Sequence, residues 1–160
     1  MSARIDQYIA QFQAASRDLI ALVTDCSEED WQRVSPGEGW TVAAIAHHVA
    51  LRNGVIAGMI DNVLAGSADV PHISRADLLT ENATHAEEYA AVSKEEVLAL
   101  LRDNGDAFVR TLGRIEDDAI LDRAGEVFAG TDLCVDYQIE EVVIAHAITH
   151  AASIRATLAA

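Results

Sequence analysis

The chain has 160 residues, of which 51% are hydrophobic, and it carries a formal net charge of -15 at pH 7. The hydrophobic content excludes a disordered chain, and the acidity argues against binding to nucleic acid or to an anionic membrane surface, where Lys and Arg must meet phosphates. At this length we expect a single domain over residues 1–160, with a core of its own.

The first expected helix runs from about Ala3 to Thr24, where apolar residues recur at helical spacing. Ser27 then predicts the N-cap of a short helix that carries Trp31. The stretch Ser35–Gly39 contains a proline and two glycines, so we expect it to break the chain.

The beginning of the chain and its two cysteines indicate the compartment. The first residues form no apolar stretch of the kind that starts a signal peptide, and charges interrupt every apolar run before it can span a bilayer. Cys26 and Cys134 lie far apart and outside any Cys-x-x-Cys motif, so we expect two free, buried thiols. These features predict a cytoplasmic protein with no membrane partner.

A second helix is expected to begin after Thr41, a suitable N-cap, and to continue to about Leu64. Gly66 then stops it. Gly54 and Gly58 lie inside this helix, and their expected role is the close approach of a neighbouring helix.

Two further helices are expected in the middle of the chain. A connection that contains His72 precedes a third helix, which begins at Ser74. The residues Ser93–Glu96 match a capping box and open a fourth helix, which continues to about Ile115. Its expected inner stripe consists of Val97, Leu101, Phe108 and Leu112.

The last third of the chain predicts a loop followed by a long helix. The loop covers about Asp122 to Thr131, with a short extended piece at Glu126–Phe128. The last helix runs from about Val135 to Leu158. Long helices joined by short links indicate a helical bundle.

Histidines interrupt the apolar stripes of two of these helices. His146 and His150 lie four residues apart, which places both imidazoles on one helix face. The stripe of the last helix reads Ile139, Val142, Val143, His146, His150 and Ile154. The stripe of the second helix reads Ala44, His48, Leu51, Val55 and Met59. A buried imidazole without a partner is costly, and one metal ion supplies a partner to all three. His48, His146 and His150 are therefore candidate ligands of a metal site with open coordination positions.

Other interpretations of the histidines stay open at this point. A His-x-x-x-His pair also occurs on helices by chance, as a pair of core or surface residues. Ala147 stands where a zincin motif has glutamate, so this helix carries no built-in general base. His47 is an alternative ligand, although it points about 100° away from His48 around the helix. His72 and His85 are expected at the surface.

Two residues close to His48 have a candidate role in a binding site. Trp40 either packs in the core or forms a wall of the site. Arg52 lies one turn beyond His48, where it either meets an anionic substrate or stays at the surface.

The histidines also carry a family resemblance. The stretch Trp40-Thr-Val-x-x-Ile-x-x-His48, followed by His146-x-x-x-His150, resembles the pattern of the DinB/YfiT-like bundles. In that pattern a tryptophan precedes the first metal-binding histidine by eight positions. The Ser-Pro-Gly-Glu-Gly stretch before Trp40 is similar to the N-terminal domain of mycothiol-dependent maleylpyruvate isomerase, a close relative. The resemblance covers nearly the whole chain and implies an all-α, up-down-down-up four-helix bundle with short extra helices. It also implies a divalent metal ion on His48, His146 and His150.

The chemistry that the resemblance implies uses a low-molecular-weight thiol, namely mycothiol, bacillithiol or glutathione, for transfer to a small electrophile or for its isomerisation. The alternatives are a metal-dependent hydrolase and a non-enzymatic, metal-binding or stress-related bundle. Zinc or nickel is the expected metal, because imidazole ligands suit both. The expected partner is a small-molecule substrate, and dimeric relatives suggest a homodimer. The relatives often have x-Gly-Gln after the last histidine, where this chain has Ala151-Ala152-Ser153, so no thiol-binding residue is assigned.

Overall fold

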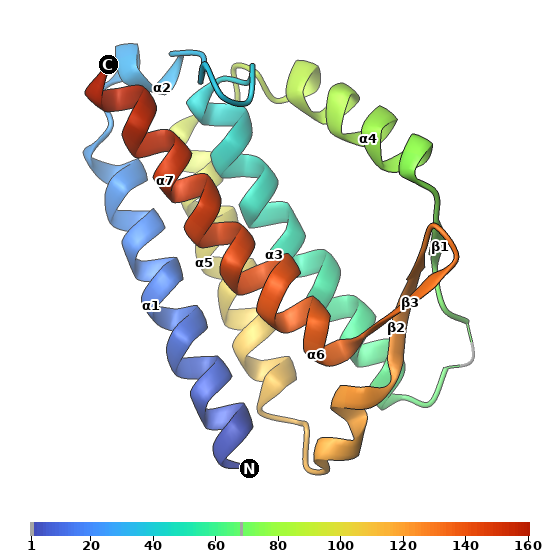
Figure 1. The fold of residues 1–160 in the computed structure, drawn as a ribbon. Coiled ribbons are helices and arrows are strands. Elements are labelled where there is room, and N and C mark those ends of the chain that lie inside the picture. The colour runs from blue at the N-terminus through green and yellow to red at the C-terminus, as the bar shows by residue number, and fades with distance from the viewer. Residues whose placement is uncertain (1, 68) are drawn as a thin grey trace.

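The computed structural model describes residues 2–67 and 69–160, in which four long helical segments form a bundle (Figure 1). The helices are α1 (Ala3–Asp25), α2 (Glu28–Trp31), α3 (Val42–Leu64), α4 (Arg75–Glu88), α5 (Lys94–Leu112), the 3-10 turn η1 (Asp118–Asp122), and a last continuous segment made of α6 (Val135–Tyr137), the π-helical η2 (Gln138–Ala145) and α7 (His146–Ala159). The strands are β1 (His72–Ile73), β2 (Ala124–Phe128) and β3 (Thr131–Cys134).

The bundle has the predicted up-down-down-up order. Helices α1 and α7 run one way and α3 and α5 the other, so the two termini lie at opposite ends (Figure 1). Each of the four packs against two others, with α3 and α5 in the most extensive contact. Helix α4 lies outside the four-helix bundle and packs against α3 at its C-terminal end (Figure 1).

Serine and threonine hydroxyls cap the helices α1 to α5, because they satisfy backbone N–H groups that lack a partner within the helix. The N-caps are Ser2, Ser27, Thr41, Ser74 and Ser93. The predicted helix starts at Ser27, Thr41, Ser74 and Ser93 are therefore confirmed. Helix α5 ends at Leu112, three residues before the predicted end at Ile115.

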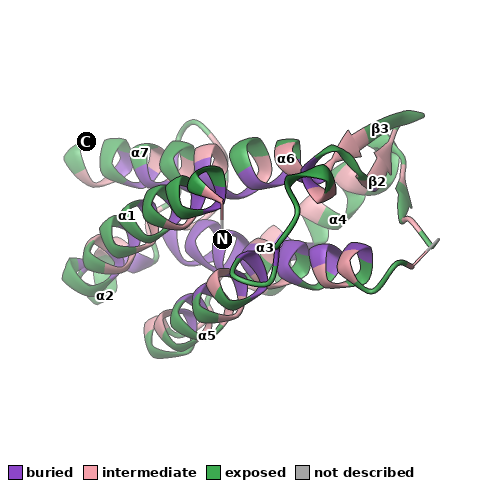
Figure 2. Ribbon diagram, turned by 90° about the horizontal axis from the view of Figure 1, so that it is seen from below, coloured by how far each residue is buried: buried purple, intermediate pink, exposed green. Residues whose placement is uncertain are grey.

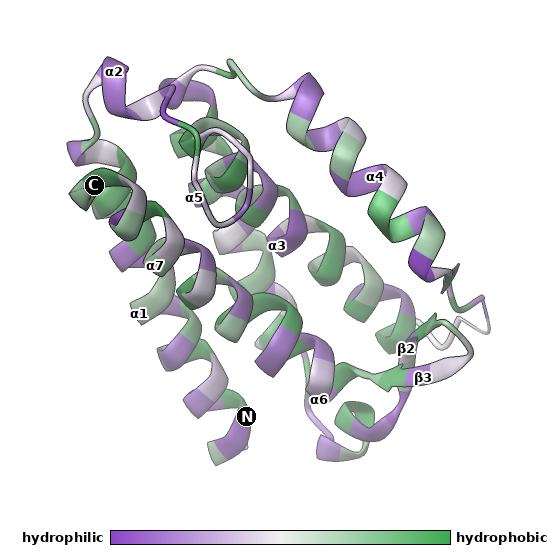
Figure 3. Ribbon diagram, turned by 45° about the horizontal axis from the view of Figure 1, so that its top comes forward, coloured by the Kyte–Doolittle hydropathy of each residue, from purple (hydrophilic) through white to green (hydrophobic). Residues whose placement is uncertain are grey.

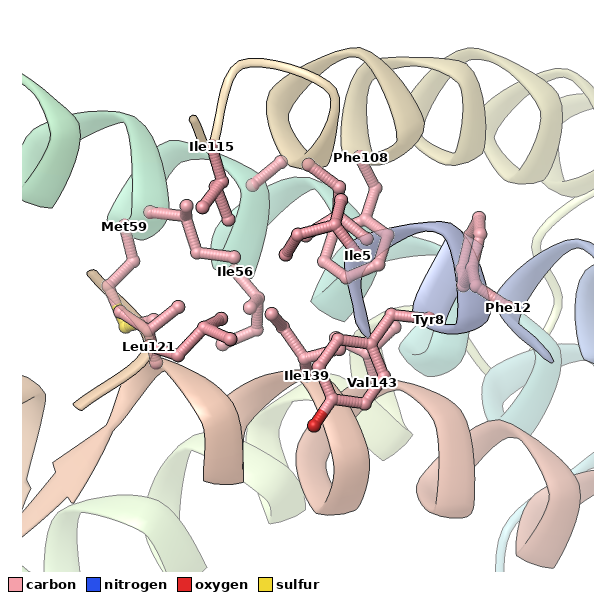
Figure 4. Close-up of a cluster of buried hydrophobic side chains, with 14 of the residues drawn as sticks. Ile5, Tyr8, Phe12, Ile56, Met59, Phe108, Ile115, Leu121, Ile139 and Val143 are labelled. Atoms are coloured by element: carbon pink, nitrogen blue, oxygen red, sulfur yellow. The ribbon is translucent and has the colours of Figure 1, made fainter. Parts of the chain in front are cut away.

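The core consists of two groups of buried apolar side chains along the bundle. One contains Ile5, Tyr8, Phe108 and Ile139, and Figure 4 shows these side chains converging from α1, α5 and the last helical segment. The other surrounds Trp31, whose indole N–H donates a hydrogen bond to the Val92 carbonyl at 2.8 Å. The predicted inner stripe of α5 is confirmed, since all four of its residues are buried. Helix α1 alternates between hydrophilic and hydrophobic residues, as a helix with one buried face should (Figure 3).

Helix α3 lies inside the bundle and is buried over much of its surface (Figure 2). The stripe predicted for it is only partly correct. Leu51 and Val55 are 39% and 48% exposed, whereas the other three members are buried. The reason is that α4 stands away from α3 at this level, so these two side chains line a cavity between the helices.

A small three-stranded sheet occupies most of the region predicted to be a loop. Strand β2 pairs antiparallel with β3 and parallel with β1, in the order β1-β2-β3. Ala129 and Gly130 turn the hairpin with φ angles of 48° and 83°, the left-handed values that a two-residue hairpin turn requires. The extended piece expected at Glu126–Phe128 is confirmed as part of β2, whereas the loop prediction is wrong for residues 124–125 and for Thr131, which also lie in strands. The pairing of β1 with β2 fixes the start of α4 against this hairpin.

The structure changes two predictions, one on membrane-spanning length and one on the burial of the cysteines. The segment Val135–Ala159 is long and apolar enough to cross a membrane by length and composition alone, contrary to the prediction that no run reaches that length. In the bundle this segment packs against α1 and α3. Cys26 is buried as predicted, whereas Cys134 is only half-buried, and both thiols are free.

The two glycines of α3 should respond in opposite ways to replacement by alanine. A Cβ at Gly54 would lie 2.7 Å from Asn104 Nδ2, which donates a hydrogen bond to the Ala50 carbonyl at 2.9 Å. A Cβ at Gly58 meets nothing within 4 Å, so the predicted close approach is confirmed for Gly54 and wrong for Gly58. We expect Gly58→Ala to stabilise the protein by about 0.5–1 kcal/mol through helix propensity. Gly54→Ala should destabilise it by about 1 kcal/mol, because overpacking outweighs that gain.

Urea denaturation of both variants and the wild type measures this difference. Gly58→Ala is the control for Gly54→Ala, because both variants replace a glycine of α3 by alanine. Equal stability of the two variants would contradict the close contact between α3 and Asn104.

Candidate metal site

Three histidines from two helices converge at one point of the bundle. His48 comes from α3, and His146 and His150 come from successive turns of α7. Their Nε2 atoms lie 3.2 Å apart between His48 and His146, and 3.0 Å apart between His146 and His150. One ring nitrogen of each histidine lies within 4.8 Å of the others, an arrangement that can hold a metal ion. The structure thus brings together the three residues that the sequence pattern singled out.

The surroundings of the cluster keep its buried imidazoles neutral. Burial, and then the neighbouring His146 and His150, lower the pKa of His48 from 6.5 to about 2. Burial, and then His150, lower the pKa of His146 from 6.5 to about 3. Both rings are therefore uncharged near neutral pH, the form in which an imidazole nitrogen binds a metal.

Glu38 orients the third imidazole. His150 Nδ1–H donates a hydrogen bond to the Glu38 carboxylate at 3.0 Å, which leaves the Nε2 lone pair facing the cluster. Burial raises the pKa of Glu38, but hydrogen bonds from His150 and Ser153 outweigh it and leave the pKa below its ordinary value. A carboxylate behind a histidine in this way is the usual support of a metal-binding imidazole. Glu38 was not predicted as a site residue, because its only signal in the sequence is an acidic residue in the loop before Trp40.

The donor set fits a divalent transition metal. A neutral imidazole nitrogen either donates or accepts, so one Nε2 atom that faces two others cannot satisfy both by hydrogen bonds. His146 Nε2 faces both other rings. Its Nδ1 is buried and has no hydrogen-bond partner within residues 2–67 and 69–160. A cation shared by the three Nε2 atoms removes the conflict among those three atoms, and three imidazoles suit zinc and nickel.

The remaining histidines lie outside the cluster. The ring of His47 stacks on Tyr89 with a centroid separation of 3.7 Å, and its Nδ1 lies 3.4 Å from His85 Nε2. His47 is therefore not placed with the three ligands. The prediction that His85 is a surface residue is wrong, because the end of α4 packs on α3 and leaves His85 only 8% exposed, near the Ala44 carbonyl. His72 is exposed in β1 as predicted.

Trp40 and two cavities surround the cluster. The Trp40 ring meets His48 edge-on at a centroid separation of 5.3 Å and also packs against the core, so both interpretations of this residue hold. A cavity of about 480 Å³ lies between α3 and α4, and we call it the groove cavity. A second, of about 410 Å³, lies between α3, the β2–β3 hairpin and η2, and we call it the hairpin cavity. His48 and Arg52 line both, so Arg52 stands next to the cluster where an anionic ligand can reach it.

Two larger cavities, each of about 600 Å³, lie away from the histidines. One is between α1 and α5, and the other is between α1 and the last helical segment. The chemistry of the donor groups therefore marks the site, and cavity size does not.

Replacing Glu38 by glutamine should weaken zinc binding by about 10–100-fold, because the amide supports the His150 imidazole less strongly than a carboxylate. Titration of the zinc-loaded protein with a competing chelator measures the affinity. Glu116→Gln, at an exposed position, is the matched control and should leave the affinity unchanged. Equal zinc affinity for Glu38→Gln and wild type would contradict this role.

Comparison with known proteins adds one match. The family model described as the mycothiol maleylpyruvate isomerase N-terminal domain matches residues 12–147. The matched region includes His48 and His146 and ends before His150. No curated protein and no solved structure gives a significant match.

Proposed function

This chain belongs to the mycothiol maleylpyruvate isomerase N-terminal domain family, and from that premise we propose a metal-dependent, thiol-using enzyme. In this proposal His48, His146 and His150 bind one divalent metal ion, zinc or nickel. The protein uses it to activate mycothiol, bacillithiol or glutathione for transfer to a small electrophile, or for isomerisation of that electrophile. The observation that carries the proposal is the convergence of three imidazole nitrogens within 4.8 Å beside two cavities.

In this proposal each residue around the cluster has a separate role. A divalent metal, when bound, supplies a Lewis acid that favours the thiolate form of a thiol. Glu38 holds the His150 ring through Nδ1, so that Nε2 stays available. Trp40 covers one side of His48 and limits the access of water there. Arg52 places a positive charge in the lining of both cavities, where it can attract an anionic ligand.

We further propose that the protein uses a thiol as a reactant, lies in the cytoplasm and forms a homodimer. The family is named for a mycothiol maleylpyruvate isomerase, which supports a thiol as one reactant. The free thiols of Cys26 and Cys134 support a reducing compartment, so we propose the cytoplasm. We also propose a homodimer, on the resemblance to dimeric relatives.

Cobalt in place of the native metal tests whether a thiol binds at the cluster. Addition of N-acetylcysteine, glutathione or mycothiol to the cobalt-loaded protein should produce a thiolate-to-cobalt charge-transfer band. The same thiol with its sulfur methylated is the control and should produce no band. A cobalt spectrum that responds to acetate and to no thiol would contradict the thiol reaction. That result would favour the alternative, a metal-dependent hydrolase in which water replaces the thiol.

A further inference from the structure

The wall of the hairpin cavity contains apolar side chains that do not take part in the core. They come from α4, from both strands of the hairpin and from α6, and they are Leu78, Phe128, Leu133 and Tyr137. In the part of the chain that the structure describes, none of the four belongs to either group of core side chains. Tyr137 is 45% exposed, and the other three are half-buried. Apolar residues that stay outside the core and gather at one cavity indicate a binding site.

The strand pairing explains how the hairpin presents apolar side chains to this cavity. Successive side chains of a strand point to opposite faces, so Glu126 and Phe128 share one face of β2. Leu133 of β3 pairs with Glu126, which places it on the same face. All three line the hairpin cavity, whereas Val127 lies on the other face of β2 and lines a different cavity. The hairpin therefore holds Phe128 and Leu133 toward the bundle.

The polar groups of the cavity wall interact with one another. Burial raises the pKa of Glu126, and Arg52 and a hydrogen bond with the Gln138 amide oppose that rise. With the exposed Glu141, the lining contains two carboxyl groups and one guanidinium, so its charge does not favour an anion. The groups left to recognise a ligand in this cavity are therefore the apolar side chains.

The size and position of the cavity indicate what it can hold. A volume of about 410 Å³ is in the range of pockets for small molecules. His48 and His146 line the same cavity, so a molecule bound there lies beside the histidine cluster. Phe128 and Tyr137 contribute two aromatic rings to the wall, and aromatic rings pack favourably on other rings.

We propose that the hairpin cavity binds an uncharged molecule with an aromatic ring, which packs on Phe128 and Tyr137 beside His48 and His146. This inference rests on the proposed function in one respect, since it makes that molecule the electrophile of the reaction. The thiol is then the anionic reactant that Arg52 attracts. Phe128 and Tyr137 are specificity-determining residues, because their rings favour an aromatic body over a short aliphatic or a charged one.

Isothermal titration calorimetry of the zinc-loaded protein with acetohydroxamate and benzohydroxamate tests this assignment. Both probes bind metal ions through the same head group, and only benzohydroxamate carries a ring. The wild type should bind benzohydroxamate about tenfold more tightly or better, the effect of burying an apolar group of that size. Phe128→Ala and Tyr137→Ala should each reduce this preference by about threefold or more. Benzohydroxamate with an added para-carboxylate should bind about tenfold more weakly than benzohydroxamate, because the cavity removes water from the charge.

Exposed apolar residues elsewhere supply the matched controls. Leu79→Ala and Ile148→Ala remove side chains that are 64% and 55% exposed and do not line the hairpin cavity, so both variants should keep the preference of the wild type. A second readout needs no metal. The fluorescence of N-phenyl-1-naphthylamine, an uncharged aromatic probe, should rise with metal-free wild type and rise less with Phe128→Ala or Tyr137→Ala.

Two results would overturn the inference and leave the metal site in place. One is equal affinity of the zinc-loaded wild type for acetohydroxamate and benzohydroxamate, or an unchanged preference in both cavity variants. The other is tighter binding of the para-carboxylate, which would show that Arg52 decides what the cavity binds. A metal-free wild type that binds the fluorescent probe through Phe128, but binds neither hydroxamate after incubation with zinc, would overturn the metal site and support the aromatic site.

Discussion

Replacement of His146 by alanine is expected to abolish stoichiometric metal binding. His146 is the middle residue of the cluster, and its Nε2 lies within 3.2 Å of the Nε2 atoms of both His48 and His150. Without it, two imidazoles remain, and the affinity should fall by more than the roughly 100-fold that loss of a supporting residue behind a ligand can cost. Elemental mass spectrometry of the tag-free proteins measures the result. We expect about one metal ion per chain in the wild type and close to none in the variant.

His47→Ala is the matched control for this experiment. It removes an imidazole that is also buried and adjacent in sequence to His48, but that stacks on Tyr89 outside the cluster. This variant should keep its metal. The metal site would be wrong if the wild type held no metal after incubation with zinc or nickel and desalting.

Phe108→Ala should cause a large loss of stability. The Phe108 side chain is fully buried on α5 and packs against Phe12 of α1, with ring centroids 4.7 Å apart (Figure 4). Truncation to alanine removes buried surface and leaves a cavity, which together cost about 3–5 kcal/mol. This is a large share of the roughly 5–15 kcal/mol that stabilises a typical domain.

Urea denaturation gives the free energy of unfolding for this comparison. Leu79→Ala removes a large apolar side chain that is 64% exposed on α4, so its effect should stay within about 0.5 kcal/mol. A similar loss in the two variants would contradict the assignment of Phe108 to the core.

The sequence predicted the parts of the fold that local chemistry decides. A hydroxyl that caps the following N–H groups predicts the start of a helix, as at Ser27, Thr41, Ser74 and Ser93. Apart from the extended piece at Glu126–Phe128, the sheet was not predicted, because β1 is only two residues long and pairs with a strand more than fifty residues away. The hairpin turn has the sequence Ala129-Gly130, and this sequence is not the Asn-Gly or Asp-Gly pair by which such turns are predicted.

In the candidate site, too, the residues with a local sequence signal could be predicted and those placed by long-range contacts could not. His48, His146 and His150 could be found because they replace apolar residues in helical stripes, and periodicity is a local signal. Glu38 could not, because a loop residue has no periodicity and its contact with His150 crosses 112 positions of the chain. His85 was assigned to the surface from its charged neighbours, although the packing of α4 on α3 buries it.

The cluster joins residues that are far apart along the chain, since His48 and His146 are separated by 98 positions. Domains are synthesised from the N-terminus, so α3 leaves the ribosome long before α7 exists. The three imidazoles therefore come together only after α7 has been synthesised and has docked on α3. A metal ion that needs all three imidazoles can therefore bind only after α7 has formed, and until then His48 is the one member of the cluster that the nascent chain contains.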